Sequence, residues 1–107
     1  MSSTKFYWRI TMFIIRNVFR CKPGQANNLI GKFKAAAPAM QQIAKQRIMV
    51  DEVAAFWTVV VEVETEDIAA FEKVLAERRQ DKSIQDAMSG YMDLIDSGYR
   101  EIFKVVA

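Results

Sequence analysis

Few side chains in this sequence are of the kinds that carry out catalysis. The chain has no histidine and a single cysteine, Cys21. Without histidine, a serine–histidine–aspartate or cysteine–histidine site, a histidine-ligated haem or zinc and an imidazole pH switch are all excluded. Cys21 lies between Arg20 and Lys22, but it has no histidine to act as its base, so it is a weak candidate nucleophile. We therefore expect neither a metal site nor a cofactor.

The charges indicate neither a nucleic acid nor a membrane as partner. The net charge is +2, and acidic and basic residues are interspersed, whereas nucleic-acid binding usually shows as a clustered basic stripe. Arg78 and Arg79 lie between acidic neighbours, which is typical of a solvated helix face. Arg9 and Arg16 interrupt the apolar run at residues 6–19, which is shorter than the ~18 residues that suggest a membrane helix. With one cysteine and no signal peptide, we expect a cytoplasmic protein.

Hydrophobic periodicity and turn residues predict the element order β-α-β-β-α-α-β. The predicted strands cover most of 6–20, then 47–51, 55–64 and 99–106. The predicted helices run from 25 to 40, from 65 to 78 and from 83 to 95. Thr65 is expected to cap the second helix and Ser83 the third, with Ser97 and Gly98 ending the third. A chain of 107 residues fits one domain over residues 1–107.

This order is the ferredoxin-like, split β-α-β pattern of the α+β class, with an additional short helix before the last strand. It predicts a four-stranded, antiparallel-type mixed sheet with its helices on one face. The first and third strands are expected to be central and parallel.

Both sides of the two predicted central strands are mostly apolar. Because alternate residues of a strand face opposite ways, one side carries Phe13, Ile15, Asn17 and Phe19 from the first strand, and Trp57, Val59, Val61 and Val63 from the third. The helices can cover only one side, and monomers rarely expose a large apolar patch. No segment is long enough to fold over the other side as a loop.

We therefore expect a second copy of the chain to cover this face, giving a twofold dimer. Arg16 and Glu62 should pair there, because an unpaired buried charge is costly. The residues expected at the dimer interface are Trp8, Ile10, Met12, Ile14, Arg16, Phe56, Thr58, Val60 and Glu62.

Two segments resemble a known superfamily, the dimeric α+β barrels. The stretch at 15–26, with Asn17, Pro23 and Gly24, looks like the first strand, glycine turn and helix start of that superfamily. The segment at 98–105 is similar to its final strand. The superfamily includes antibiotic-biosynthesis-type monooxygenases, haem-degrading monooxygenases and NIPSNAP-like proteins. The resemblance covers nearly the whole chain in element order and implies a homodimeric ferredoxin-like barrel.

The resemblance also implies a pocket between the sheet and the helices. Asn17 matches an asparagine of the haem-degrading members, but Val63 stands where they have a tryptophan and no histidine is present, so haem degradation is not implied. The antibiotic-type members activate oxygen without metal or flavin, which needs an apolar cavity and a few hydrogen-bond donors. The expected ligand-binding residues are Asn17, Trp57 and Tyr91 as polar groups, with Phe33, Met40 and Met88 as apolar walls.

Each of these residues also has a structural interpretation. Asn17 could satisfy backbone groups near a strand end, and Trp57 and Tyr91 could be core aromatics. Three functional hypotheses therefore stay open. The first is a homodimeric small-molecule-binding protein, as a cofactor-independent monooxygenase or isomerase acting on an apolar or aromatic substrate. The second is a non-catalytic binding or interaction module. The third, an RNA-binding split β-α-β domain, is disfavoured because Phe56 alone does not replace the stacking motif of the third strand.

Overall fold

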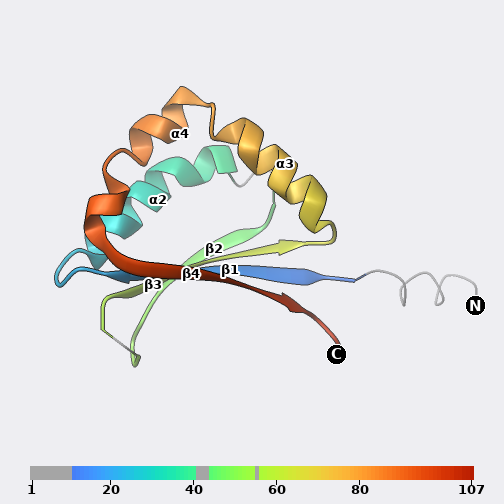
Figure 1. Cartoon of the computed structure of the whole chain (residues 1–107), viewed down its shortest axis with the longest axis horizontal. Coiled ribbons are helices and arrows are strands. Elements are labelled where there is room, and N and C mark those ends of the chain that lie inside the picture. Colours follow the sequence, from blue (N-terminus) through green and yellow to red (C-terminus); the bar gives the residue numbers. More distant parts are fainter. Residues whose placement is uncertain (1–10, 41–43, 55) are drawn as a thin grey trace, which may run out of the picture.

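Four strands form an antiparallel sheet, and the helices cover one of its faces (Figure 1). The computed structural model describes residues 11–40, 44–54 and 56–107. The elements are β1 (Phe13–Cys21), α2 (Ala26–Met40), β2 (Gln46–Val50), β3 (Thr58–Thr65), α3 (Ile68–Arg78), α4 (Lys82–Ala87), the 3₁₀ helix η1 (Tyr91–Leu94) and β4 (Ile95–Lys104). The strand order is β2-β3-β1-β4. The predicted α+β, ferredoxin-like fold with helices on one face is confirmed.

The first and third strands are central, as predicted, but the prediction that they are parallel is wrong. Phe13 lies opposite Thr65 and Arg20 lies opposite Thr58, which is an antiparallel register. The reason lies in the connections: the hairpin between β2 and β3 reverses the chain, and β3 then inserts between β1 and β2. All three strand pairs are consequently antiparallel.

β3 begins at Thr58, three residues later than the predicted strand. Trp57 has a φ of 62°, in the left-handed region that an extended strand cannot contain. The hairpin closes on Asp51 instead, whose Oδ1 accepts a hydrogen bond of 3.0 Å from the Thr58 amide. The alternation of strand faces therefore does not continue back to Trp57 and Phe56.

Aspartates cap α3 and α4, in place of the predicted Thr65 and Ser83. Asp67 Oδ1 accepts a 3.0 Å hydrogen bond from the Ala70 amide at the start of α3. Asp81 Oδ1 accepts a 2.8 Å bond from the Ser83 amide at the start of α4. The sequence does not distinguish the caps, because threonine, serine and aspartate all cap helices well. Each helix start carries two such residues two positions apart.

The third predicted helix is shorter than its periodicity suggests. α4 ends at Ala87, Gly90 turns the chain with a φ of 76°, and η1 follows. β4 begins at Ile95, so Ser97 and Gly98 lie inside the strand and do not end a helix. A side chain at Gly98 would have its Cβ 3.2 Å from the Val18 carbonyl oxygen, which explains why glycine suits this strand position.

The core lies between the sheet and the helices as two clusters of buried side chains. One contains Cys21, Ala26, Leu29 and Val59, and the other contains Ile15, Val63 and Phe71. Asn17 and Val61 lie between the clusters along β1 and β3, and they face the same side of the sheet. The polar side chain of Asn17 therefore interrupts the apolar packing in the middle of the helix-covered face.

Two glycine substitutions test the description of the helical layer. Gly31 lies in α2 and a Cβ there would meet nothing within 4 Å, whereas Gly90 has the left-handed φ on which the α4–η1 turn depends. Gly31→Ala should raise the free energy of unfolding by about 0.5–1 kcal/mol, because alanine is the better helix former. Gly90→Ala should lower it by about 1–2 kcal/mol. Chemical denaturation measures both, and changes of the same sign would contradict this assignment.

Candidate functional site

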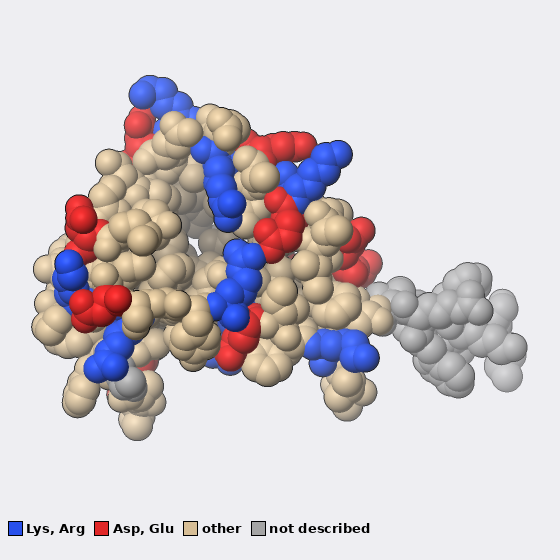
Figure 2. All heavy atoms as spheres, in the orientation of Figure 1, with Lys and Arg blue, Asp and Glu red and all other residues tan. Residues whose placement is uncertain are grey.

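A cavity of about 590 Å³ lies between the helices and the sheet. In Figure 2 the molecule is hollowed between its helical part and its sheet, with charged side chains near the opening. The cavity is lined by Asn17, Phe19, Phe33, Ala36, Met40, Gln46, Val61, Val63, Phe71, Leu75, Arg79, Ile84, Gln85, Met88, Tyr91 and Arg100.

Every strand and helix contributes to this cavity. The antiparallel register places Asn17 of β1 opposite Val61 of β3 on one side and Arg100 of β4 on the other, so these three side chains share the floor. α2 contributes Phe33, Ala36 and Met40, and α3 contributes Phe71 and Leu75. The turn after α4 brings in Met88 and Tyr91.

Five of the expected ligand-binding residues line the cavity, namely Asn17, Phe33, Met40, Met88 and Tyr91. Trp57 does not line it. It lies in the hairpin before β3, in a left-handed conformation, with 43% of its surface exposed. Trp57 was expected in the cavity because the predicted strand included it, so that it would face the same side as Val59 and Val61. β3 begins only at Thr58, after Trp57.

Asn17 and Arg100 on the floor of the cavity form a polar cluster with Glu72, which reaches Arg100 from α3 and does not itself line the cavity. Arg100 Nε donates a hydrogen bond of 2.9 Å to Asn17 Oδ1, and Arg100 Nη1 forms an ion pair with Glu72 of α3. Since a guanidinium only donates, the oxygen of the Asn17 amide must face Arg100. The Asn17 Nδ2 group forms no hydrogen bond within the described part of the chain, which leaves it available to a ligand.

Four polar lining residues were not anticipated from the sequence: Gln46, Arg79, Gln85 and Arg100. Arg100 reaches the cavity because β4 pairs with β1, and this register cannot be read from the local sequence. Arg79 was expected on a solvated helix face. It is exposed, as expected, but it follows the end of α3 at the rim of the cavity.

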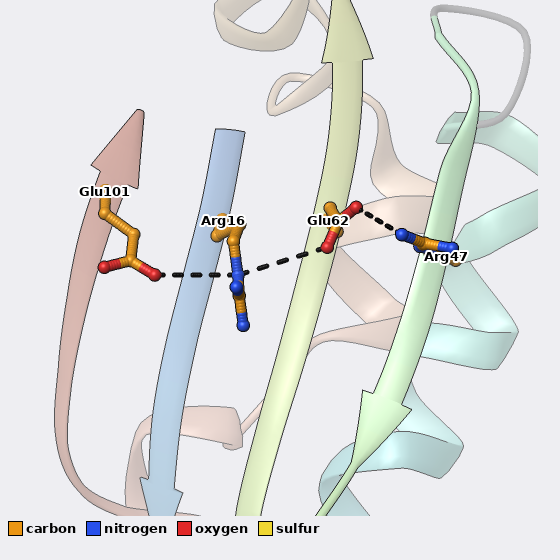
Figure 3. Close-up of polar contacts among 4 residues, drawn as sticks. All are labelled: Arg16, Arg47, Glu62 and Glu101. Carbon is orange, nitrogen blue, oxygen red and sulfur yellow. Dashed lines mark hydrogen bonds and ion pairs between the residues drawn. The ribbon is translucent and has the colours of Figure 1, made fainter. Parts of the chain in front are cut away.

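The opposite face of the sheet carries a row of alternating charges across all four strands (Figure 3). From β4 to β2 the row is Glu101, Arg16, Glu62 and Arg47. Arg16 Nε lies 4.0 Å from Glu62 Oε2 and 3.6 Å from Glu101 Oε1, and Arg47 Nη2 lies 2.7 Å from Glu62 Oε1. The predicted Arg16–Glu62 pair is confirmed, although its members face each other across antiparallel strands.

This charge row leaves one buried donor unsatisfied. Glu62 is 8% exposed and is held by two arginines. Arg16 Nε is buried, and no acceptor within the described residues lies at hydrogen-bond distance from it. An unsatisfied buried donor is unfavourable, so the row is incompletely paired within one chain.

Large apolar side chains lie on the same open face. By the register Ile14, Val18, Val60, Tyr99 and Phe103 share the side of Arg16, and Tyr99 and Phe103 are 62% and 50% exposed. Thr58 also belongs to this side, whereas Phe56 is exposed in the hairpin.

Three further residues were expected at this interface. Met12 precedes β1 and borders a second hollow together with Phe71 and Val74 of α3. Trp8 and Ile10 lie outside the described residues.

Two other searches over the described residues bear on function. No group of three or more histidine, cysteine, aspartate or glutamate side chains in these ranges could hold a metal ion. None of the described helices has the length and hydrophobicity needed to cross a membrane.

The sheet order and the helical layer define a ferredoxin-like α+β protein, and solved structures share this fold. One is a NIPSNAP family protein of unknown function from Agrobacterium tumefaciens, with a TM-score of 0.76, 15% identity and coverage of 88% of this chain and 87% of that chain. Another is an uncharacterized NIPSNAP-like domain protein from Burkholderia xenovorans, with a TM-score of 0.73, 15% identity and coverage of 85% and 82%.

A third similar structure comes from Chloroflexus aurantiacus and is named as an antibiotic biosynthesis monooxygenase. Its TM-score is 0.67, with 18% identity and coverage of 90% of this chain and 94% of that chain. No protein family and no curated protein matches the sequence. These neighbours share the ferredoxin-like fold that the resemblance implied, and at these identities they establish the fold alone.

Cys21 is packed in the core next to the cavity end of β1 and is 2% exposed. Burial raises the pKa of its thiol above the ordinary value, and the negative charges of Asp51 and Asp96 add to this effect. A thiol that is buried and protonated is a poor nucleophile, so the structure argues against a catalytic role for Cys21.

We expect Cys21 to react with a maleimide only as fast as the protein unfolds. Because the thiol pKa is higher in the folded state, the unfolded state loses its proton first as the pH rises, and the free energy of unfolding should fall above about pH 9. Denaturation of the wild type and of Cys21→Ala between pH 7 and 10 measures this dependence, which should be weaker in the variant. Rapid labelling of the folded protein would contradict the buried assignment.

Proposed function

We propose that this protein is a homodimer that binds a small apolar or aromatic molecule in the cavity between its sheet and its helices. The observation that carries the proposal is the cavity itself. Its volume of about 590 Å³ lies within the ~300–1,000 Å³ of typical ligand pockets. Its walls are mainly aliphatic, aromatic and methionine side chains, with few polar groups among them, which is the usual composition of such a site.

The polar groups of the cavity are better suited to orienting a ligand by hydrogen bonds than to accepting a proton from it. Asn17, Gln46, Gln85 and two arginines can donate hydrogen bonds at neutral pH, but none of them is a good base. No carboxylate or histidine occurs among the described residues that line the cavity. A cofactor-independent monooxygenase or isomerase reaction would therefore need a substrate that is already ionised. If no such substrate reacts, the protein would be a non-catalytic binding module that uses the same cavity.

Two alanines of α2 provide a matched test of binding. Ala36 is buried and lines the cavity, whereas its neighbour Ala35 is exposed to solvent. Ala36→Leu should weaken the binding of 1-naphthol at least tenfold, because the larger side chain fills part of the cavity, whereas Ala35→Leu should leave it unchanged. Binding is followed by NMR titration, and circular dichroism verifies that both variants fold.

Equal binding by the two leucine variants would mean that 1-naphthol does not occupy the cavity. Native mass spectrometry of the wild type as purified supplies an independent measurement, since a retained small molecule would be released by Ala36→Leu and not by Ala35→Leu.

The open face of the sheet supports the dimer. Its apolar side chains surround the charge row, and burying apolar surface contributes roughly 25 cal/mol per Å². The row supports a second copy as partner because its signs alternate. A twofold axis parallel to the strands, passing between β1 and β3, would reverse the order of the row in the second copy. Each arginine of one row would then face a glutamate of the other. Such an interface is self-complementary, as twofold symmetry requires.

Two substitutions at equally exposed positions test the dimer. Tyr99 on the open face and Met92 in η1 are both 62% exposed. The wild type should sediment at about twice the chain mass of 12.3 kDa at micromolar concentration. Tyr99→Asp should shift this equilibrium toward monomer, because it places a charge against apolar side chains. Met92→Asp should leave it unchanged, and a monomeric wild type would refute the proposed interface.

A further inference from the structure

We propose that the cavity selects a ligand with a single anionic head group, and that this group binds Arg100 and the Asn17 amide by displacing Glu72. The inference rests on the proposed binding function and specifies the class of ligand. The ligand would be an aromatic or aliphatic carboxylate, or a phenolate or enolate, with an apolar body. The body would lie against the side chains of α2, α3 and the α4–η1 turn.

The charge of the cavity favours an anionic ligand. Its described lining includes Arg79 and Arg100 and no acidic side chain. Glu72 now neutralises Arg100, so Arg79 supplies the positive potential, and displacement of Glu72 by a ligand would add the charge of Arg100. A neutral ligand would make no use of this potential, whereas an anion would be stabilised by it.

Arg100 is placed to receive such an anion. It extends from the edge strand β4 beside Asn17 of β1, and its Nε is fixed by Asn17 Oδ1 at 2.9 Å. A guanidinium has five donors in a planar fork that suits a carboxylate. Because Asn17 Oδ1 is occupied by Arg100, its Nδ2 group is free to donate to the same anion. One carboxylate could therefore accept from Arg100 and Asn17 together.

Glu72 now occupies the place of the ligand's head group. It reaches Arg100 from α3 at the edge of the cavity, and the side chains of Arg100 and Glu72 are 35% and 39% exposed. Ion pairs with this degree of exposure are weak, so an anion held by both Arg100 and Asn17 can replace Glu72. Glu72 can then turn toward solvent, since it does not line the cavity.

Arg79 contributes a second positive charge at the rim. Its carbonyl oxygen accepts a 2.9 Å hydrogen bond from Gln85 Nε2, which fixes the backbone where α3 leads into α4. Its guanidinium forms no ion pair with any described residue. Arg79 therefore adds to the attraction for an anion without being neutralised by a neighbour.

The experiment compares 1-naphthoate with 1-naphthamide, a neutral probe of nearly the same shape, by calorimetric titration. The wild type should bind the carboxylate at least tenfold more tightly than the amide. Arg100→Gln should abolish this preference while still binding the amide. Glu72→Gln should strengthen 1-naphthoate binding several-fold and leave 1-naphthamide unchanged. Lys104→Gln is the matched control, because it removes the same charge from β4 at a residue that does not line the cavity.

Each alternative result has a defined meaning. Equal affinity of the wild type for the two probes would overturn selection of an anion and leave the binding function standing. Binding of neither probe at millimolar concentration would overturn both proposals. Weaker binding of 1-naphthoate by Glu72→Gln would show that Glu72 supports the anion site and would overturn the displacement. Loss of the preference in Lys104→Gln would assign it to net charge, which also overturns the role of Arg100.

Discussion

The antiparallel register between β1 and β3 determines most of what this molecule can do. Residues directly opposite each other in such a pair face the same side of the sheet. The pairing of Asn17 with Val61 therefore fixes the cavity floor, and the pairing of Arg16 with Glu62 fixes the charge row on the other face. A shift of β3 by one residue would turn its side chains to the other face. It would bury Glu62 under the helices, away from Arg16, and place the core side chains of Val61 and Val63 on the open face.

The helical layer leaves a cavity because it does not pack uniformly against the sheet. Buried side chains gather at the two ends of the layer, around Leu29 at one end and Phe71 at the other. The short α4 and the glycine turn before η1 hold Met88 and Tyr91 at the cavity, where Tyr91 also packs against the cluster around Leu29. A longer regular helix in this place would present a continuous apolar face to the sheet. The space therefore follows from a local break in helical structure, and the flexible methionine side chains are well suited to adapt around a ligand.

The two faces of the sheet manage charge in different ways. On the open face four charges alternate and largely compensate one another, which favours contact with an identical surface. On the helix face the compensation is incomplete, because two arginines border the cavity and, among the described residues, Glu72 alone pairs with one of them. The proposed dimer would use the open face, and the proposed anion site lies on the helix face. The solved structures of similar fold establish the architecture alone.

The sequence by itself determined the element order, the central position of the first and third strands, and the Arg16–Glu62 pair. These follow from side-chain periodicity of two in strands and 3.6 in helices, which is a local property. The pocket itself was implied by the resemblance to the α+β barrels, and five of the six residues expected there line the cavity. Tertiary structure decided the rest. The start of β3 depended on the conformation of Trp57. The direction of β3 depended on its insertion between β1 and β2, and Arg100 reached the cavity only through the pairing of β4 with β1. These features arise from contacts between residues far apart in the chain, up to 83 positions for Arg100 and Asn17, and local patterns carry no information about such distances.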